Sequence, residues 1–218
     1  QNLAVTASFP PGSVLKTVTL GASIEEGFST PGRWLTVEPT YEFLEIPYND
    51  HNIGRWETEE MTVTDILARS SNVGTIQLSE ELRSIGELEN GGDVLAGYLD
   101  RFGFGQFSGL DLPLQTRGRV PDPVDWYDSD FGGIPIGQGI TATPLQIASA
   151  YGSIANGGLR VPANLIRAVV DGESDADRSS IARQIDRTQD AAQVVSDATA
   201  AALTEMLVQV VERGTGGG

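Results

Sequence analysis

The 218-residue sequence predicts a mainly helical α+β protein, and three observations support this class. Several segments carry apolar residues at helical spacing between recognisable start and stop residues. Residues 28–60 mix proline, glycine, threonine, glutamate and aromatic residues without a sustained period, and we expect extended segments and loops there. Residues 165–170 form a short apolar run typical of a strand. The length suits one domain, or part of one.

The first helix is expected over residues 13–26. A Pro-Pro-Gly sequence directly precedes it and suits a sharp entry, which places Ser13 in the first turn. Gly27 supplies the stop signal.

Three shorter helices follow in the sequence. Thr62 and Asp65 have the spacing of a capping box, which predicts a helix over 62–69. Apolar residues at helical spacing predict two more helices, over 73–83 and 94–102, with a loop at 87–93 between them.

The second half of the chain alternates irregular and helical segments. Residues 103–135 are rich in Gly, Pro and Asp and are expected to be a long irregular segment. Thr143-Pro144 places an N-cap before a first-turn proline and predicts a helix that ends at Asn156. Residues 172–188 are polar and predict a hairpin or an exposed excursion. Ser196 caps the longest helix, which ends near Arg213 with Gly214 at its C′ position.

Ser13 and Lys16 are the first candidates for chemistry. Lys16 is the only lysine of the chain and follows Ser13 by three residues, so a helix places both side chains on one face. A serine hydroxyl is a weak nucleophile until a neighbouring base takes its proton. A lysine amine serves as that base when burial lowers its pKa. The exposed N–H groups of a first helical turn also favour a developing anion. Ser-x-x-Lys alone is common, so chance is the competing interpretation.

Composition excludes several classes of function. Thirty acidic against 14 basic residues give a net charge of −16, which argues against nucleic acid and anionic membrane surfaces as partners. The absence of cysteine excludes thiolate catalysis, disulfides and cysteine-based metal sites. His51, the only histidine, lies in a polar turn and rules out a multi-histidine metal site, so we expect no metal and no organic cofactor.

Other local signals favour structural interpretations. Asp122, Asp125, Asp128 and Asp130 lack the spacing of a calcium-binding loop and predict an exposed acidic loop. The segment 87–90 contains two glutamates and is similar to the loop that carries the deacylating glutamate in some hydrolases. Its spacing is wrong for such a loop. The three tryptophans are scattered, which favours packing over a base-stacking platform.

The motifs together resemble those of class B penicillin-binding proteins. Ser13-x-x-Lys16 is similar to the first family motif, and Ser70-Ser71-Asn72 to the second. The likeness continues in order through further segments: Arg101–Gly105, Ser108–Pro113, Ile134–Gln146, Ala150-Tyr151, Ile154–Gly158 and Val210–Gly216. The Ile-Pro-Ile-Gly-Gln-Gly sequence at 134–139 most resembles the cell-division transpeptidase branch.

The resemblance implies a role for each motif residue. Ser13 would attack the D-Ala-D-Ala carbonyl of a peptidoglycan stem peptide, with Lys16 as the general base. Ser70, hydrogen-bonded to Lys16, would relay a proton toward the leaving D-alanine. Asn72 would bind the substrate's peptide amide and help orient Lys16. The backbone N–H of Ser13 would supply half of an oxyanion hole. Penicillins would acylate Ser13 and stay bound.

One departure from the family pattern stands out. The third motif, Lys-Thr-Gly, cannot be present, because Lys16 is the only lysine and the chain ends in Gly216-Gly217-Gly218. We expect both ends to be cut and not natural, through engineering, proteolysis or the omission of disordered parts. The resemblance therefore implies that residues 1–218 are a partial transpeptidase domain. It would have the β-lactamase-like fold, represented mainly by its helical part with an incomplete central antiparallel sheet.

Three functions remain open at this point. The chain is the core of a peptidoglycan transpeptidase acylated at Ser13, or a hydrolytic relative such as a β-lactamase or D,D-carboxypeptidase. Otherwise it is a catalytically incomplete fragment with a structural or interaction role. The resemblance implies a membrane-anchored parent protein on the outer face of the bacterial cytoplasmic membrane. Its partners would be stem peptides, β-lactams and division proteins.

Overall fold

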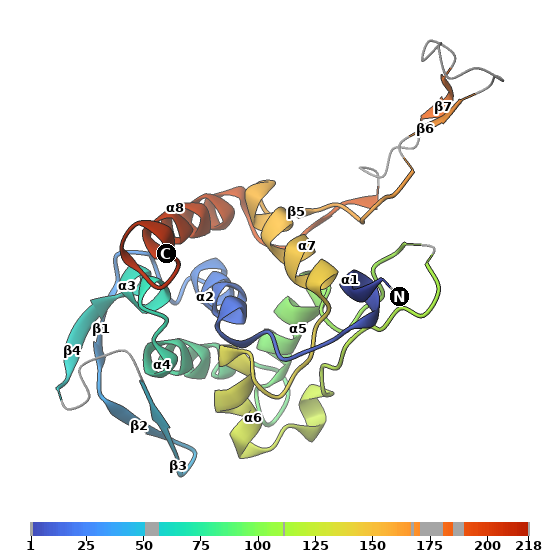
Figure 1. The fold of residues 1–218 in the computed structure, drawn as a ribbon. Helices are drawn as coiled ribbons and strands as arrows, with labels where there is room; N and C mark the ends of the chain where they lie inside the picture. The colour runs from blue at the N-terminus through green and yellow to red at the C-terminus, as the bar shows by residue number, and fades with distance from the viewer. Residues whose placement is uncertain are drawn as a thin grey trace.

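The computed structural model consists mainly of helices with a few short strand pairs (Figure 1). It describes residues 2–50, 57–110, 112–166, 168–170, 181–184 and 190–217. The α-helices are α1 (Leu3–Thr6), α2 (Lys16–Glu25), α3 (Val63–Ala68), α4 (Asn72–Arg83), α5 (Asp93–Arg101), α6 (Asp128–Gly133), α7 (Pro144–Ala155) and α8 (Asp197–Arg213). Three 3₁₀ turns are η1 (Gly12–Leu15), η2 (Pro123–Asp125) and η3 (Ile134–Ile136).

The strands of the described residues form four separate antiparallel pairs. They are β1 (Trp34–Val37) with β4 (Glu59–Thr62), β2 (Thr40–Phe43) with β3 (Ile46–Asn49), β5 (Leu159–Arg160) with β8 (Ala192–Gln193), and β6 (Ala168–Val170) with β7 (Ile181–Gln184). Of the polar segment 172–188, the structure describes only 181–184, which form β7, so the hairpin or exposed excursion expected there stays a prediction. The strand expected over 165–170 is confirmed only for 168–170, because residues 165 and 166 are not in a strand.

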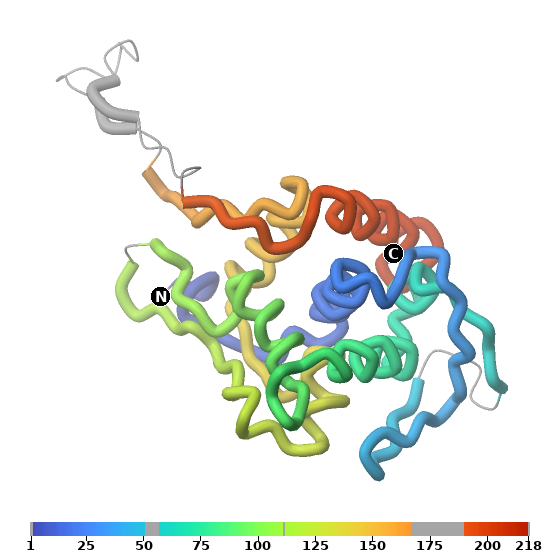
Figure 2. Tube along the Cα trace, turned by 180° about the vertical axis from the view of Figure 1, so that it is seen from behind, coloured from blue at the N-terminus to red at the C-terminus, as the bar shows by residue number. Residues whose placement is uncertain are grey.

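Helix α2 is the centre of the hydrophobic core. All residues from Lys16 to Ser23 are buried, and the helix packs against α4, α5 and α8. Figure 1 shows α2 among these helices, and Figure 2 shows the β1–β4 and β2–β3 pairs at the end of the molecule opposite the N-terminus. A helix buried around its whole circumference is held rigidly, because any shift would open cavities or cause overlaps.

The predicted caps position most helices as expected. Capping boxes begin α3 at Thr62 and α7 at Thr143, and Ser196 accepts the Thr199 N–H at the start of α8. Gly214 ends α8 as predicted, but with an extended backbone rather than a left-handed one. A Cβ on Gly214 would lie 2.2 Å from the Ala68 carbonyl oxygen, so close packing of α8 on α3 requires the glycine.

Two helical predictions need correction. The helix expected over 13–26 is a 3₁₀ turn followed by an α-helix from Lys16. The segment 103–135, expected to be irregular, contains η2, α6 and the start of η3. Tertiary packing forms α6: Phe131 is buried and meets the Trp126 ring edge-on, at 5.4 Å between ring centroids. A six-residue helix has too little periodicity to be seen in the sequence.

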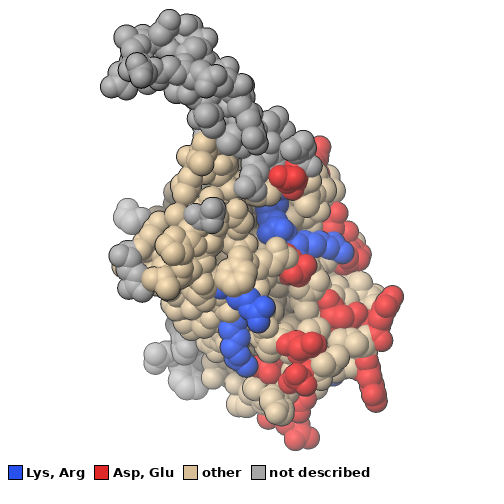
Figure 3. Space-filling view, turned by 90° about the vertical axis from the view of Figure 1, so that its right-hand side faces the viewer, with Lys and Arg blue, Asp and Glu red and all other residues tan. Residues whose placement is uncertain are grey.

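The surface reflects the acidic composition. Figure 3 shows acidic side chains spread along one edge of the face it draws, with basic side chains gathered in smaller groups. In the described part of the chain, no helix is long and apolar enough to cross a membrane.

Candidate active site

Ser13 is exposed on the 3₁₀ turn η1, directly before the buried helix α2. The turn is supported from behind by the segment after η3. The N–H of Gly12 donates to the Gly137 carbonyl at 3.0 Å. Gly137 has φ +81°, and a Cβ there would lie 2.0 Å from the Gly12 carbonyl oxygen. The sequence at 134–139 therefore serves to bring backbone against backbone beneath Ser13.

Helix α7 holds the same turn from the side through Tyr151. The Tyr151 hydroxyl donates to the Val14 carbonyl at 2.9 Å. It also lies 3.0 Å from the Thr17 hydroxyl, which is then the donor of that hydrogen bond. One side chain thus links the residue after Ser13 to the first turn of α2.

Lys16 is the first residue of α2 and is only 1% exposed. Its Nζ donates to the Ser70 carbonyl at 2.5 Å and to the Ser70 hydroxyl at 3.0 Å. Burial lowers the pKa of Lys16 to about 8, and the nearby Asp50 carboxylate partly opposes this by favouring the charged amine. A pKa near the working pH suits an amine that must both take and return a proton.

Ser70 lies in the short junction between α3 and α4. Its N–H donates to the Leu67 carbonyl and the Ser71 N–H to the Ile66 carbonyl, the paired hydrogen bonds of a Schellman motif. The motif requires a left-handed residue at Ser70, whose φ is +57°. Glycine is the usual residue in this conformation, so a serine here accepts local strain. The conformation turns the chain so that the carbonyl and hydroxyl of Ser70 both meet Lys16.

Asp50, on the segment after β3, anchors this junction and was missed by the sequence analysis. Its carboxylate accepts hydrogen bonds from the Ser71 hydroxyl at 2.5 Å, from the Val73 N–H at 3.2 Å and from the Asn72 N–H. Asp50 is buried, and its charge lies at the N-terminus of α4, where the helix dipole favours an anion. In the sequence Asp50 is one of 30 acidic residues and lies in a polar turn, and no local signal distinguishes it.

The structure brings two of the four predicted site residues into direct contact, namely Lys16 and Ser70. Ser13 shares a face with Lys16, because side chains three residues apart eclipse each other along a 3₁₀ turn. Asn72 begins α4, and its Nδ2 donates to the Asn49 carbonyl at 3.2 Å. Among the described residues no hydrogen bond joins Asn72 to Lys16, so its orienting role stays a prediction.

The segments set aside in the sequence have structural partners. The N–H groups of Glu87 and Leu88 both donate to the carboxylate of Asp93, which shapes the loop before α5. Asp122 and Asp130 accept backbone N–H groups at the starts of η2 and α6. In the described part of the chain, no group of three or more His, Cys, Asp or Glu residues has metal-binding geometry. His51 and Trp56 lie outside the described residues.

The arrangement has the parts needed for serine-based acyl transfer. An exposed serine lies three residues before a buried amine of lowered pKa, and that amine is hydrogen-bonded to a second hydroxyl. Such a set can activate a nucleophile and pass its proton to a leaving group.

Comparisons with known proteins identify the family of this chain. The family model of the penicillin binding protein transpeptidase domain matches residues 1–218. The penicillin-binding protein PbpB of Mycobacterium tuberculosis is 37% identical over 214 residues, which cover 97% of this chain and 29% of that protein. The peptidoglycan D,D-transpeptidase FtsI of Escherichia coli K12 is 28% identical over 172 residues, covering 77% of this chain and 26% of that protein.

The fold agrees as well. The crystal structure of penicillin binding protein 3 from M. tuberculosis, complexed with ampicillin, aligns with a TM-score of 0.80 and 37% identity. The alignment covers 99% of this chain and 44% of that chain. The chain thus spans less than half the length of these relatives. On the family match, the identity and the shared fold, the chain belongs to the penicillin-binding protein transpeptidase family.

Proposed function

We propose that this chain carries the acylation centre of a peptidoglycan D,D-transpeptidase that crosslinks stem peptides and is acylated by β-lactams. The observation that carries the proposal is the buried amine of Lys16, hydrogen-bonded to Ser70 and one 3₁₀ turn after the exposed Ser13. A lone lysine without access to water costs stability, so its place in the core favours a chemical role.

In the first half of the reaction, Ser13 is the nucleophile. Lys16, with a pKa of about 8, holds a useful fraction of neutral amine near neutral pH and accepts the Ser13 proton. The Ser13 oxygen then attacks the carbonyl between the two D-alanines. The Ser13 backbone N–H, in the first turn of the helix, is the proposed donor to the resulting oxyanion.

In the second half, the tetrahedral intermediate collapses and the terminal D-alanine leaves. Ser70 passes the proton from Lys16 to the leaving amine, a path supported by the 3.0 Å hydrogen bond between the two side chains. Asn72 is proposed to bind the substrate's peptide amide. An amine of a neighbouring stem peptide attacks the acyl-enzyme, forms the new amide and releases Ser13 with its proton restored through Lys16.

The proposal also covers the parent protein of this chain and its place in the cell. We infer that residues 1–218 are part of a transpeptidase domain whose Lys-Thr-Gly strand lies elsewhere in the parent protein. The parent is proposed to be a class B enzyme of the cell-division branch, anchored in the cytoplasmic membrane with this domain on its outer face. The names of the M. tuberculosis and E. coli relatives, a penicillin-binding protein and a peptidoglycan D,D-transpeptidase, support the transpeptidase part of this inference. The branch and the anchor rest on the resemblance of the motifs. Division proteins are its proposed partners.

Intact-protein mass after incubation with benzylpenicillin tests the proposal, with Ser13→Ala as the matched variant. We expect a lasting adduct on the unsubstituted chain and none on the variant. An adduct lost quickly, with release of hydrolysed penicillin, would indicate a β-lactamase or D,D-carboxypeptidase relative. A folded chain without any adduct, as judged by circular dichroism, would mean that the chain alone is an incomplete site.

A further inference from the structure

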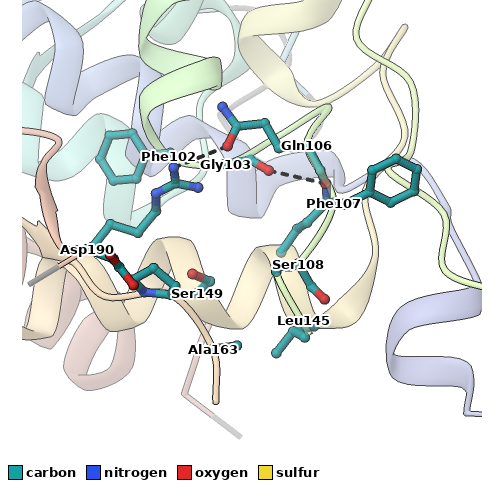
Figure 4. Close-up of a pocket in the computed structure, with 13 residues that line it drawn as sticks. Phe102, Gly103, Gln106, Phe107, Ser108, Leu145, Ser149, Ala163 and Asp190 are labelled. Carbon is teal, nitrogen blue, oxygen red and sulfur yellow. Dashed lines mark hydrogen bonds between the residues drawn. The ribbon is translucent and has the colours of Figure 1, made fainter. Parts of the chain in front are cut away.

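A second cavity, beyond the proposed acylation site, lies between the end of α5 and helix α7. It is half-enclosed and has a volume of about 270 Å³. Its walls include Phe102, Leu145 and Pro162 together with two charged residues, Arg160 and Asp190. None of the four proposed site residues lines it. Figure 4 shows Asp190 and Ser149 on one side of the space and Ser108 and Leu145 on the other.

Arg160 is positioned by its surroundings but not neutralised by them. Its Nη2 donates to the Gln106 side-chain oxygen at 3.1 Å. Gly103, with φ +91°, makes room for the guanidinium, because a Cβ there would lie 2.3 Å from Nη1. Three other arginines form salt bridges within the described part of the chain, whereas Arg160 pairs with no carboxylate there. Four other described arginines also lack such a pair, namely Arg83, Arg101, Arg117 and Arg119, but none of these four lines the cavity.

Asp190 gives the same cavity an opposite charge. Its carboxylate forms no salt bridge with Arg160 or with any other described cation. A purely anionic ligand would be repelled by Asp190, and a purely cationic one by Arg160. A ligand that carries both charges can pair with each, and charge-assisted hydrogen bonds of this kind are the stronger ones.

The rest of the cavity wall is apolar and favours a ligand with a small apolar group. Leu145, Pro162 and Ala163 contribute carbon surface to the cavity. Its volume is at the lower end of the range for small-molecule sites, about 300–1,000 Å³, which limits the occupant to a few heavy atoms beyond its charged groups. We propose that this cavity binds an amino-acid-sized zwitterion with an apolar side chain, its carboxylate at Arg160 and its ammonium group at Asp190.

Titration of the chain with L-leucine, followed by NMR, tests the proposal without use of the acylation reaction. For so small a ligand we expect a dissociation constant on the order of 1 mM. N-acetyl-L-leucine lacks the ammonium group and L-leucinamide lacks the carboxylate, so each should bind about tenfold more weakly. Equal binding of all three compounds, or no saturable binding of L-leucine, would overturn the proposal.

Two variants test which residue binds the carboxylate of the ligand and which binds its ammonium group. Arg160→Gln should weaken L-leucine about tenfold, whereas Arg119→Gln makes the same change of charge outside the cavity and should leave the affinity unchanged. Asp190→Asn should weaken L-leucine but not N-acetyl-L-leucine. An unchanged affinity in Arg160→Gln, or an equal loss in Arg119→Gln, would contradict the assignment. The ligand comparison does not require a variant to fold, so it remains decisive if one does not.

Discussion

The two sides of the proposed acylation site are built in opposite ways. The Lys16 side is buried, and the junction that it contacts is held by the Schellman motif at Ser70 and by Asp50. The Ser13 side is an exposed turn, whose backbone donates a hydrogen bond to the Gly137 carbonyl and accepts one from the Tyr151 hydroxyl. The Ser13 hydroxyl itself has no hydrogen-bond partner among the described residues.

This difference separates proton transfer from substrate access. A general base needs a fixed environment, because its pKa depends on how much water and which charges surround it. A nucleophile that attacks a large peptide substrate needs open space in front of its oxygen. Burial and hydrogen bonds therefore hold Lys16 in a fixed environment, whereas Ser13 is supported only through the backbone of its turn.

The largest expected effect comes from removal of the base. Lys16→Met keeps a side chain of similar length but has no amine, so benzylpenicillin acylation should slow by about 10²- to 10⁴-fold. The variant should remain folded, because an apolar side chain is readily accommodated at a buried site. Stopped-flow acylation kinetics and circular dichroism measure the two effects. Acylation at the original rate would exclude Lys16 as the base.

Stability should depend on pH through the same lysine. The folded pKa of about 8 lies below the ordinary lysine pKa of 10.5, so between these values the unfolded chain holds a proton that the folded chain has lost. The free energy of unfolding should therefore rise as pH increases from about 8 toward 10.5, by up to about 3 kcal/mol. Urea unfolding at several pH values measures it. Lys16→Met serves as the control, and the rise attributed to Lys16 should be missing from it.

Asp50→Asn removes the carboxylate that holds the junction between α3 and α4 by hydrogen bonds. Loss of the charged acceptor for Ser71 and the α4 N-terminus should lower the free energy of unfolding by about 1–3 kcal/mol. Without the carboxylate the pKa of Lys16 should fall further, which moves the rise of acylation rate to lower pH. The control is Asp125→Asn, an exposed residue with the same change of charge. A shift of the pH profile in both variants would point to net charge instead of position.

Tyr151→Phe should change stability and the acylation rate less than the other substitutions. Tyr151 supports the exposed turn that carries Ser13. It removes the hydrogen bonds to the Val14 carbonyl and the Thr17 hydroxyl, which should cost about 0.5–1.5 kcal/mol of stability. Acylation should slow a few-fold, because the turn that carries Ser13 loses one support. Tyr41→Phe removes a hydroxyl near the surface and should not change the rate. If both variants slow acylation equally, Tyr151 has no special part in positioning the turn.

Much of the fold could be predicted from local signals. The capping box at Thr62 and the N-caps at Thr143 and Ser196 were predicted correctly, because side-chain capping involves residues two or three positions apart. Helix α6 and the strand pairs β5–β8 and β1–β4 were not predicted individually. Their stability comes from partners distant in the sequence, for example Leu159 against Gln193, and such pairing leaves no periodic local pattern.

The features of the candidate site also divide into those set by local sequence and those set by tertiary contacts. The sequence by itself determined that Ser13 and Lys16 share a face and that Ser70-Ser71-Asn72 interrupts two helices, since helical spacing and caps are local properties. Only the tertiary structure decided that Lys16 is buried against Ser70, that Asp50 anchors the junction, and that Gly137 lies under the Ser13 turn. These contacts join residues 21 to 125 positions apart in the chain. They also set the pKa of the lysine, because that pKa depends on the water and charges that packing leaves around the amine.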